Sequence, residues 1–136
     1  MAGEIRDAGG ISPEAAQFET ADIAAPFPPE TTLVTGLGLL DWLEPDQIDD
    51  LFSRLKGRRF ILSFSEQDKS LDEIVHRIYL VWRLRFFGKG VRAYHHKRRF
   101  ILDLARRHDL GEVEIHSAPS MRFGRLLHNL NQGEAT

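Results

Sequence analysis

The side chains best placed to contact a ligand follow an apolar run in the first third of the chain. Residues 33–40 read as a buried strand that leaves through a turn containing Gly36 and Gly38, and Asp41 and Trp42 come next. Ligands of an open α/β sheet bind where its strands end, so this strand predicts a site directly after it. Asp41 and Trp42 would lie where a substrate approaches, although an aromatic residue there is more often part of the packing.

The two glycines and a nearby acid allow more than one interpretation. A dinucleotide-binding loop would need a third glycine at position 41, which is Asp41. The glycines then serve to shape the turn, and they also let the backbone approach a ligand closely. Asp22 stands beside a proline-rich connection, where it is either a solvated turn residue or a ligand contact.

Adjacent histidines at 95 and 96 suggest a metal site or a general base. Neighbouring residues on a helix point in different directions, and no acidic residue or cysteine stands at ligand spacing, so we expect no metal site. A base role for one histidine stays open, because an unperturbed imidazole titrates near neutral pH.

The segment 83–107 is strongly basic, with nine bases against the single acid Asp103. Trp82, Phe86, Phe87 and Tyr94 are interleaved with those bases. Such a stretch can follow a phosphate backbone, but a solvated basic helix face is commoner, so nucleic acid is not the favoured partner. The bases are Arg83, Arg85, Lys89, Arg92, Lys97, Arg98, Arg99, Arg106 and Arg107.

Composition indicates one ordinary globular domain. The chain has 136 residues, of which 42% are hydrophobic and 28% charged. It has no cysteine, which excludes disulfides and thiolate chemistry. No apolar run approaches the roughly 18–20 residues that span a bilayer, and the start lacks a secretion signal, so we expect a cytoplasmic protein.

Periodicity and capping signals predict the following order of elements. Residues 1–16 read as a helix remnant or loop, 17–20 as a short strand and 131–136 as a polar tail. Helices are expected over 45–56, from 71 to just before Gly88, and from about His96 to His108. Strands are expected at 60–64 and 112–116, and 121–130 can return as an antiparallel strand. The result is an α/β sheet, mainly parallel, with an antiparallel hairpin at its C-terminal edge.

Each predicted helix has an apolar face that we expect to be buried. Ser70 and Glu73 have the spacing of a capping box at the start of the middle helix. The three faces consist of Ile48, Leu51, Phe52 and Leu55, then of Leu71, Ile74, Val75, Ile78 and Trp82, and then of Phe100, Ile101, Leu104 and Ala105.

Several stretches, in order, resemble class I S-adenosylmethionine (SAM)-dependent methyltransferases. They are Phe18-Glu-Thr-Ala-Asp22-Ile23, the stretch from Thr32 through Asp41-Trp42-Leu43, Arg58-Arg-Phe-Ile-Leu-Ser-Phe64, Tyr94-His95-His96 with the following helix, and 112–130. The resemblance covers about 17–130, which would be a partial methyltransferase domain. The family's first strand, its glycine-rich SAM-binding loop and its ribose-binding acid have no counterpart in these 136 residues.

The resemblance implies a Rossmann-like methyltransferase sheet in truncated form, and SAM-dependent methyl transfer to a small molecule or biosynthetic intermediate. Asp22, Ile23, Gly36 and Leu37 would line the cofactor, while Asp41, Trp42 and Tyr94 would face the acceptor. The missing half would come from a partner chain, or the chain would self-associate. The alternative is a non-catalytic methyltransferase-like module that binds RNA or a protein through 83–107.

Overall fold

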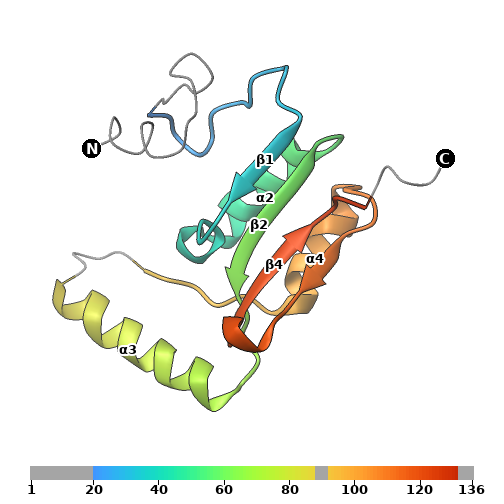
Figure 1. The fold of residues 1–136 in the computed structure, drawn as a ribbon. Coiled ribbons are helices and arrows are strands. Elements are labelled where there is room, and N and C mark those ends of the chain that lie inside the picture. Colours follow the sequence, from blue (N-terminus) through green and yellow to red (C-terminus); the bar gives the residue numbers. More distant parts are fainter. Residues whose placement is uncertain (1–19, 88–91, 132–136) are drawn as a thin grey trace, which may run out of the picture.

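The fold is a mixed four-stranded sheet with two helices on one face (Figure 1). The computed structural model describes residues 20–87 and 92–131. Its strands are β1 (Leu33–Gly36), β2 (Arg59–Ser65), β3 (Glu114–His116) and β4 (Gly124–His128), in the spatial order β1-β2-β4-β3. β1 and β2 are parallel, and β4 lies antiparallel to both β2 and β3. The predicted α/β class and the antiparallel C-terminal pair are therefore confirmed.

Helices and 3-10 turns of the described chain connect these strands. A 3-10 turn, η2 (Leu40–Trp42), follows β1 and leads into α2 (Pro45–Leu55). α3 (Leu71–Phe87) and α4 (Arg98–Arg107) both lie between β2 and β3, and a second 3-10 turn, η3 (Pro119–Met121), precedes β4.

α2 is fixed by its first turn and by its apolar face. The backbone N–H of Glu44 donates to the Gln47 side chain, and Pro45 occupies the first turn, where its missing N–H costs nothing. All four predicted core residues of this helix are buried. Gly57, at φ +74°, follows the last turn in the left-handed conformation that glycine adopts readily.

The core lies between α2, α4 and one face of the sheet (Figure 1). Phe60, Leu62 and Phe64 alternate along β2 and point into it. On α4, Ile101, Leu104 and Ala105 are buried, with Phe100 partly buried against them. The predicted inward face of this helix is confirmed, but the helix begins at Arg98 and not at about His96.

The prediction of a buried face on the middle helix is wrong. α3 stands away from the sheet and from α2 and α4 (Figure 1). Leu71, Val75, Ile78 and Trp82 are all more than half exposed, and Ile74 is only partly buried. The apolar side chains surround the helix in place of forming one stripe, so a heptad-like spacing did not identify a buried face.

The predicted buried strand at 33–40 is also shorter and more exposed than expected. β1 covers Leu33–Gly36, and Leu33 is 46% exposed. Within the described residues β1 pairs with β2 alone, which makes it an edge strand. Its apolar sequence predicted neighbours on both sides.

Some predicted segments lie outside the described residues. These are the helix remnant at 1–16, most of the strand at 17–20, and nearly all of the tail at 131–136. Thr20, the last residue of that predicted strand, is irregular. Within the described residues, the helices are too short or too polar to cross a membrane.

Candidate functional site

The turn after β1 is held by a serine of the neighbouring strand. Gly38 has φ +71° and donates its N–H to the Ser63 hydroxyl over 2.6 Å. A Cβ on Gly36 would lie 3.0 Å from the Leu62 side chain, so a larger residue there would force that side chain to shift. Both glycines thus have structural reasons for their identity. Leu37 between them is 76% exposed.

Asp41 ties η2 to the end of β2. One carboxylate oxygen accepts the Ser65 backbone N–H over 2.7 Å, and the other accepts the Ser65 hydroxyl over 2.8 Å. Ser63 and Ser65 are two residues apart on one strand, so both face the turn that follows β1. The spacing Ser-Phe-Ser at a strand end is a signal that could have identified them.

The segment before α4 is hydrogen-bonded to both η2 and the end of β2. Tyr94 donates its N–H to the Asp41 carbonyl over 2.7 Å, and His96 donates its N–H to the Ser65 carbonyl over 2.8 Å. The structure therefore brings Asp41 and Tyr94 together, as their predicted roles require.

His96 is a buried residue that precedes α4, which corrects the expectation that a helix begins at about His96. It is 5% exposed, and its Nε2 lies 2.8 Å from the Leu40 carbonyl oxygen. Because a carbonyl only accepts, this nitrogen must carry the hydrogen. His96 thereby connects η2 to the segment that precedes α4.

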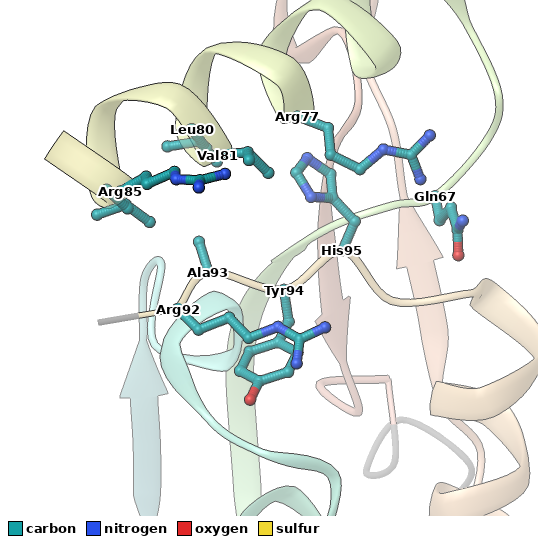
Figure 2. Close-up of a pocket in the computed structure, with 10 residues that line it drawn as sticks. Gln67, Arg77, Leu80, Val81, Arg85, Arg92, Ala93, Tyr94 and His95 are labelled. Carbon is teal, nitrogen blue, oxygen red and sulfur yellow. The ribbon is translucent and has the colours of Figure 1, made fainter. Parts of the chain in front are cut away.

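A cavity of about 610 Å³ opens between α3 and residues 92–95 (Figure 2). That volume lies in the range of small-molecule sites, roughly 300–1,000 Å³. Tyr94 lines it, as do Gln67 and His95, whereas Asp41 and Trp42 do not. Three arginines, Arg77, Arg85 and Arg92, are also in its lining, together with apolar side chains from α3.

His95 belongs to a group of partly buried rings beside this cavity. Its Nε2 lies 3.3 Å from Nδ1 of His76, which in turn stacks on the Phe123 ring at 4.4 Å between centroids. Burial lowers the pKa of His95 below its ordinary value of 6.5, against the opposing effect of the Glu73 carboxylate. A histidine with this pKa is neutral at pH 7 and can accept a proton.

Glu73 is fully buried, and neither of its carboxylate oxygens has a hydrogen-bond partner among the residues that the structure describes. It forms an ion pair with Arg77, whose Nε lies 3.7 Å from Glu73 Oε1. The predicted capping box is half formed: Ser70 Oγ accepts the Glu73 N–H, but the Ser70 N–H is taken by Asp68.

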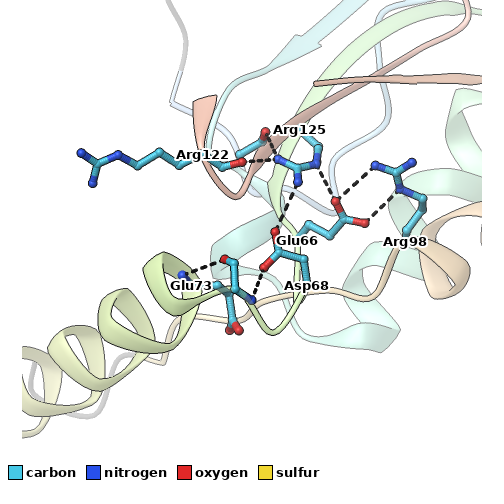
Figure 3. A network of polar contacts seen from close by, with 8 residues as sticks. Glu66, Asp68, Glu73, Arg98, Arg122 and Arg125 are labelled. Atoms are coloured by element: carbon cyan, nitrogen blue, oxygen red, sulfur yellow. Dashed lines mark hydrogen bonds and ion pairs between the residues drawn. The ribbon is translucent and has the colours of Figure 1, made fainter. Parts of the chain in front are cut away.

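An ionic cluster holds the end of β2 against α4 and β4 (Figure 3). Glu66 is 7% exposed and accepts hydrogen bonds from Arg98 and Arg125. Arg125 also reaches Asp68 and the carbonyls of Arg122 and Gly124. Every side of the buried Glu66–Arg125 pair is therefore satisfied, which is the condition for such a pair to be tolerated.

Asp22 and Ile23 lie near the other end of β1. Asp22 is exposed, and its carboxylate accepts the Ala24 N–H within its own turn. The Ile23 carbonyl accepts a hydrogen bond from Arg54 in the last turn of α2. Because α2 returns from the carboxyl end of β1 to the start of β2, Arg54 lies at the amino-terminal end of β1. The described structure does not bring Asp22 and Ile23 together with Gly36 and Leu37.

Many bases of the 83–107 segment are paired with acids. Arg98 binds Glu66, Arg99 and Arg106 flank Asp103, and Arg107 binds Asp49. These ion pairs offset part of the positive charge that, from the sequence, could have bound a phosphate backbone.

Sequence reasoning did not identify the residues of α3 that surround the cavity. Arg77 and Arg85 are eight residues apart with Val81 midway, which is a spacing for one helix face. This signal was available, but the stronger apolar pattern of the same helix concealed it.

The described chain has a class I methyltransferase-like fold. It is similar to the SAM-dependent methyltransferase SibL in its apo form, with a TM-score of 0.71 and 16% identity over 93% of this chain and 38% of that chain. It is also similar to the pyocyanin biosynthetic protein PhzM, with a TM-score of 0.58 and 14% identity over 79% of this chain and 32% of that one.

A third similar structure contains bound SAH. Magnesium protoporphyrin IX methyltransferase (ChlM) from Synechocystis PCC 6803, with bound SAH, has a TM-score of 0.51 and 24% identity over 82% of this chain and 48% of that chain. The chain spans less than half the length of each of these proteins. No family model and no curated protein sequence matches it.

Proposed function

We propose that this chain forms the acceptor-binding part of a SAM-dependent methyltransferase that acts on a small molecule. The observation that carries the proposal is the cavity beside Tyr94, next to the carboxyl ends of β1 and β2, in a fold similar to three methyltransferases. Ligands of open α/β sheets bind at the carboxyl ends of the parallel strands.

The described residues fit only one side of a SAM site. The turn at Gly36–Gly38 offers backbone and the exposed Leu37 side chain, while Asp22 and Ile23 lie at the other end of β1. We therefore propose that Gly36 and Leu37 contact the cofactor and that further residues outside the described part complete its site. Cofactor roles for Asp22 and Ile23 stay predictions from the resemblance.

SAM, when bound, would supply a methyl group from its sulfonium, and the neutral thioether would be the leaving group. This chain's residues would then orient the acceptor, which is the main contribution an enzyme makes to such a transfer. Tyr94 would lie against the acceptor, and Asp41 would hold the Tyr94 backbone through its carbonyl. His95, neutral at pH 7, would take the proton from an acceptor that loses one. The contact between Trp42 and the acceptor stays a prediction. The cytoplasmic location also stays a prediction.

The non-catalytic alternative has less support. It needs a continuous basic surface on 83–107, whereas Arg98, Arg106 and Arg107 are engaged with acidic side chains.

Amide chemical shifts during a SAM titration test the proposal. We expect weak binding by the isolated chain, with the largest changes at Gly36, Leu37 and Gly38. Adenosine at the same concentration serves as a control for nonspecific contacts. Changes confined to the far end of β1, or none at millimolar SAM, would refute the cofactor contact. Tight binding, at micromolar SAM or below, would show instead that these 136 residues hold the cofactor without the glycine loop.

A further inference from the structure

The cavity between α3 and residues 92–95 has a one-sided charge. Its lining contains Arg77, Arg85 and Arg92 but no acidic side chain. In Figure 2, Arg85 extends from α3 along one wall of the space, and Arg92 belongs to the opposite segment, with its side chain beside the Tyr94 ring. An arrangement of this kind favours an anionic ligand, since guanidinium groups bind carboxylates through paired hydrogen bonds.

Two of these arginines are available to a ligand. Arg77 lies 3.7 Å from the buried Glu73, so its charge is partly offset. Neither Arg85 nor Arg92 makes an ion pair with any acid of residues 20–87 and 92–131. Arg92 instead lies over the Tyr94 ring, with its guanidinium carbon 5.1 Å from the ring centroid.

The remaining walls are apolar and include a ring. Leu80, Val81 and Leu84 come from α3, and Ala93 and Tyr94 from the opposite segment. Apolar walls with a few convergent polar groups are typical of small-molecule sites. Tyr94 adds an aromatic side chain to the lining, beside which an aromatic ring of the ligand can pack.

We propose that this cavity binds an apolar, ring-bearing carboxylic acid, with its carboxylate between Arg85 and Arg92 and its ring beside Tyr94. That this acid is the methyl acceptor rests on the proposed function. The binding itself does not, because it requires only the side chains of α3 and of residues 92–95.

Calorimetric titration of the full chain with two matched probes tests the carboxylate. The probes are 2-naphthoate and 2-naphthamide, which share the ring system and differ in charge. We expect naphthoate to bind roughly tenfold tighter, as one or more hydrogen bonds to a charged group imply. Equal affinities would overturn the proposal, as would a preference for 2-naphthyl phosphate over naphthoate, which would indicate a phosphate site.

Three arginine variants locate the effect. Arg85→Gln and Arg92→Gln should each remove most of the preference for naphthoate. Arg83→Gln is the control, since Arg83 is on the same helix and carries the same charge but lies outside the cavity lining, bonded to the Tyr79 hydroxyl. An equal loss in all three would show a general charge effect and refute the site. Circular dichroism verifies that each variant is folded.

The outcome can be separated from that of the proposed function, because the titration contains no SAM. Naphthoate binding without any SAM contact at Leu37 would leave a carboxylate site on a chain that does not use the cofactor. A SAM contact without naphthoate binding would leave the methyltransferase proposal and remove this acceptor class.

Discussion

Asp41 accepts both hydrogen bonds that Ser65 donates at the end of β2, at 2.7 Å from the backbone N–H and 2.8 Å from the hydroxyl. The two residues are far apart in sequence and on different elements. Their bonds connect the turn after β1 to the last residue of β2. The same turn also holds Tyr94, whose backbone N–H donates to the Asp41 carbonyl. Asp41 therefore fixes the positions of Ser65 and Tyr94, and its predicted contact with an acceptor would be a separate role.

Asp41→Ala should lower the free energy of unfolding by roughly 1.5–3 kcal/mol, because two donors lose a charged acceptor. Urea denaturation measures the change. Asp46→Ala, at an exposed position in the first turn of α2, is the control and should change stability much less. Ser65→Ala combined with Asp41→Ala in a double-mutant cycle should show coupling. Additive effects would mean that the pair contributes nothing jointly.

His96→Ala should also destabilise the chain, by about 1–3 kcal/mol, since the Leu40 carbonyl loses its buried donor. His96→Gln can place an N–H near the same position and should recover part of the loss. The sequence predicted that a helix begins at about His96, and an exposed residue at a helix start usually changes stability little when replaced. A neutral His96→Ala variant would support that earlier interpretation against the structure.

The parts of the fold that the sequence predicted are those with local signals. The proline and acids at the start of α2, with Ile48 and Leu51 in its stripe, specify a helix from residues within a few positions of one another. The alternation around Ile115 likewise identifies β3. Neither depends on a distant partner.

The candidate site depends on contacts between residues far apart in sequence. Nothing near Asp41 indicates that its carboxylate meets Ser65, and nothing near Glu73 indicates that its carboxylate is left unpartnered. Apolar sequence also failed to predict burial on α3, where the described chain supplies no packing partner. Burial is a property of the neighbours as much as of the residue.

The free energy of unfolding should decrease as the pH is lowered below about 6.5, because of His95. Burial holds its pKa below 6.5, so between the folded pKa and 6.5 the unfolded chain binds more protons. The stabilisation is complete above 6.5 and is lost as pH falls toward the folded pKa. The groups that modify this behaviour are Glu73 and Asp41, which raise the pKa, and His76 and Arg77, which lower it.

Urea midpoints at several pH values between 5 and 8 (roughly the range in which histidine titrates) measure the effect. His95→Gln should flatten the slope relative to the parent, whereas His116→Gln, an exposed control, should leave it unchanged. An unchanged slope in His95→Gln would show that another group causes the pH dependence.

The exposed edge of β1 should make the chain self-associate or bind a partner. Among residues 20–87 and 92–131, β1 has a partner on one side only, and Leu33 leaves apolar surface on this strand. An unpaired strand edge is a template for another strand. We expect sedimentation velocity to show association that rises with concentration. Leu33→Lys should reduce it, because a charge on an edge strand opposes pairing, and Ser120→Lys, an exposed site in η3, should not. A compact monomer with a sharp, reversible melt would contradict this expectation.

One pair of isoleucines tests the contrast between α2 and α3 directly. Ile48 on α2 is fully buried, while Ile78 on α3 is 64% exposed. Ile48→Ala should cost about 2–5 kcal/mol, since it removes core contacts and leaves a cavity. Ile78→Ala should change stability by no more than about 0.5 kcal/mol, as is usual for surface positions. Both variants lose the same atoms from a helix, so helix propensity changes equally and the difference reports burial alone. If Ile78→Ala proved as costly as Ile48→Ala, then α3 would be packed against something in solution, and a second copy of the chain would be the first partner to test by sedimentation of that variant.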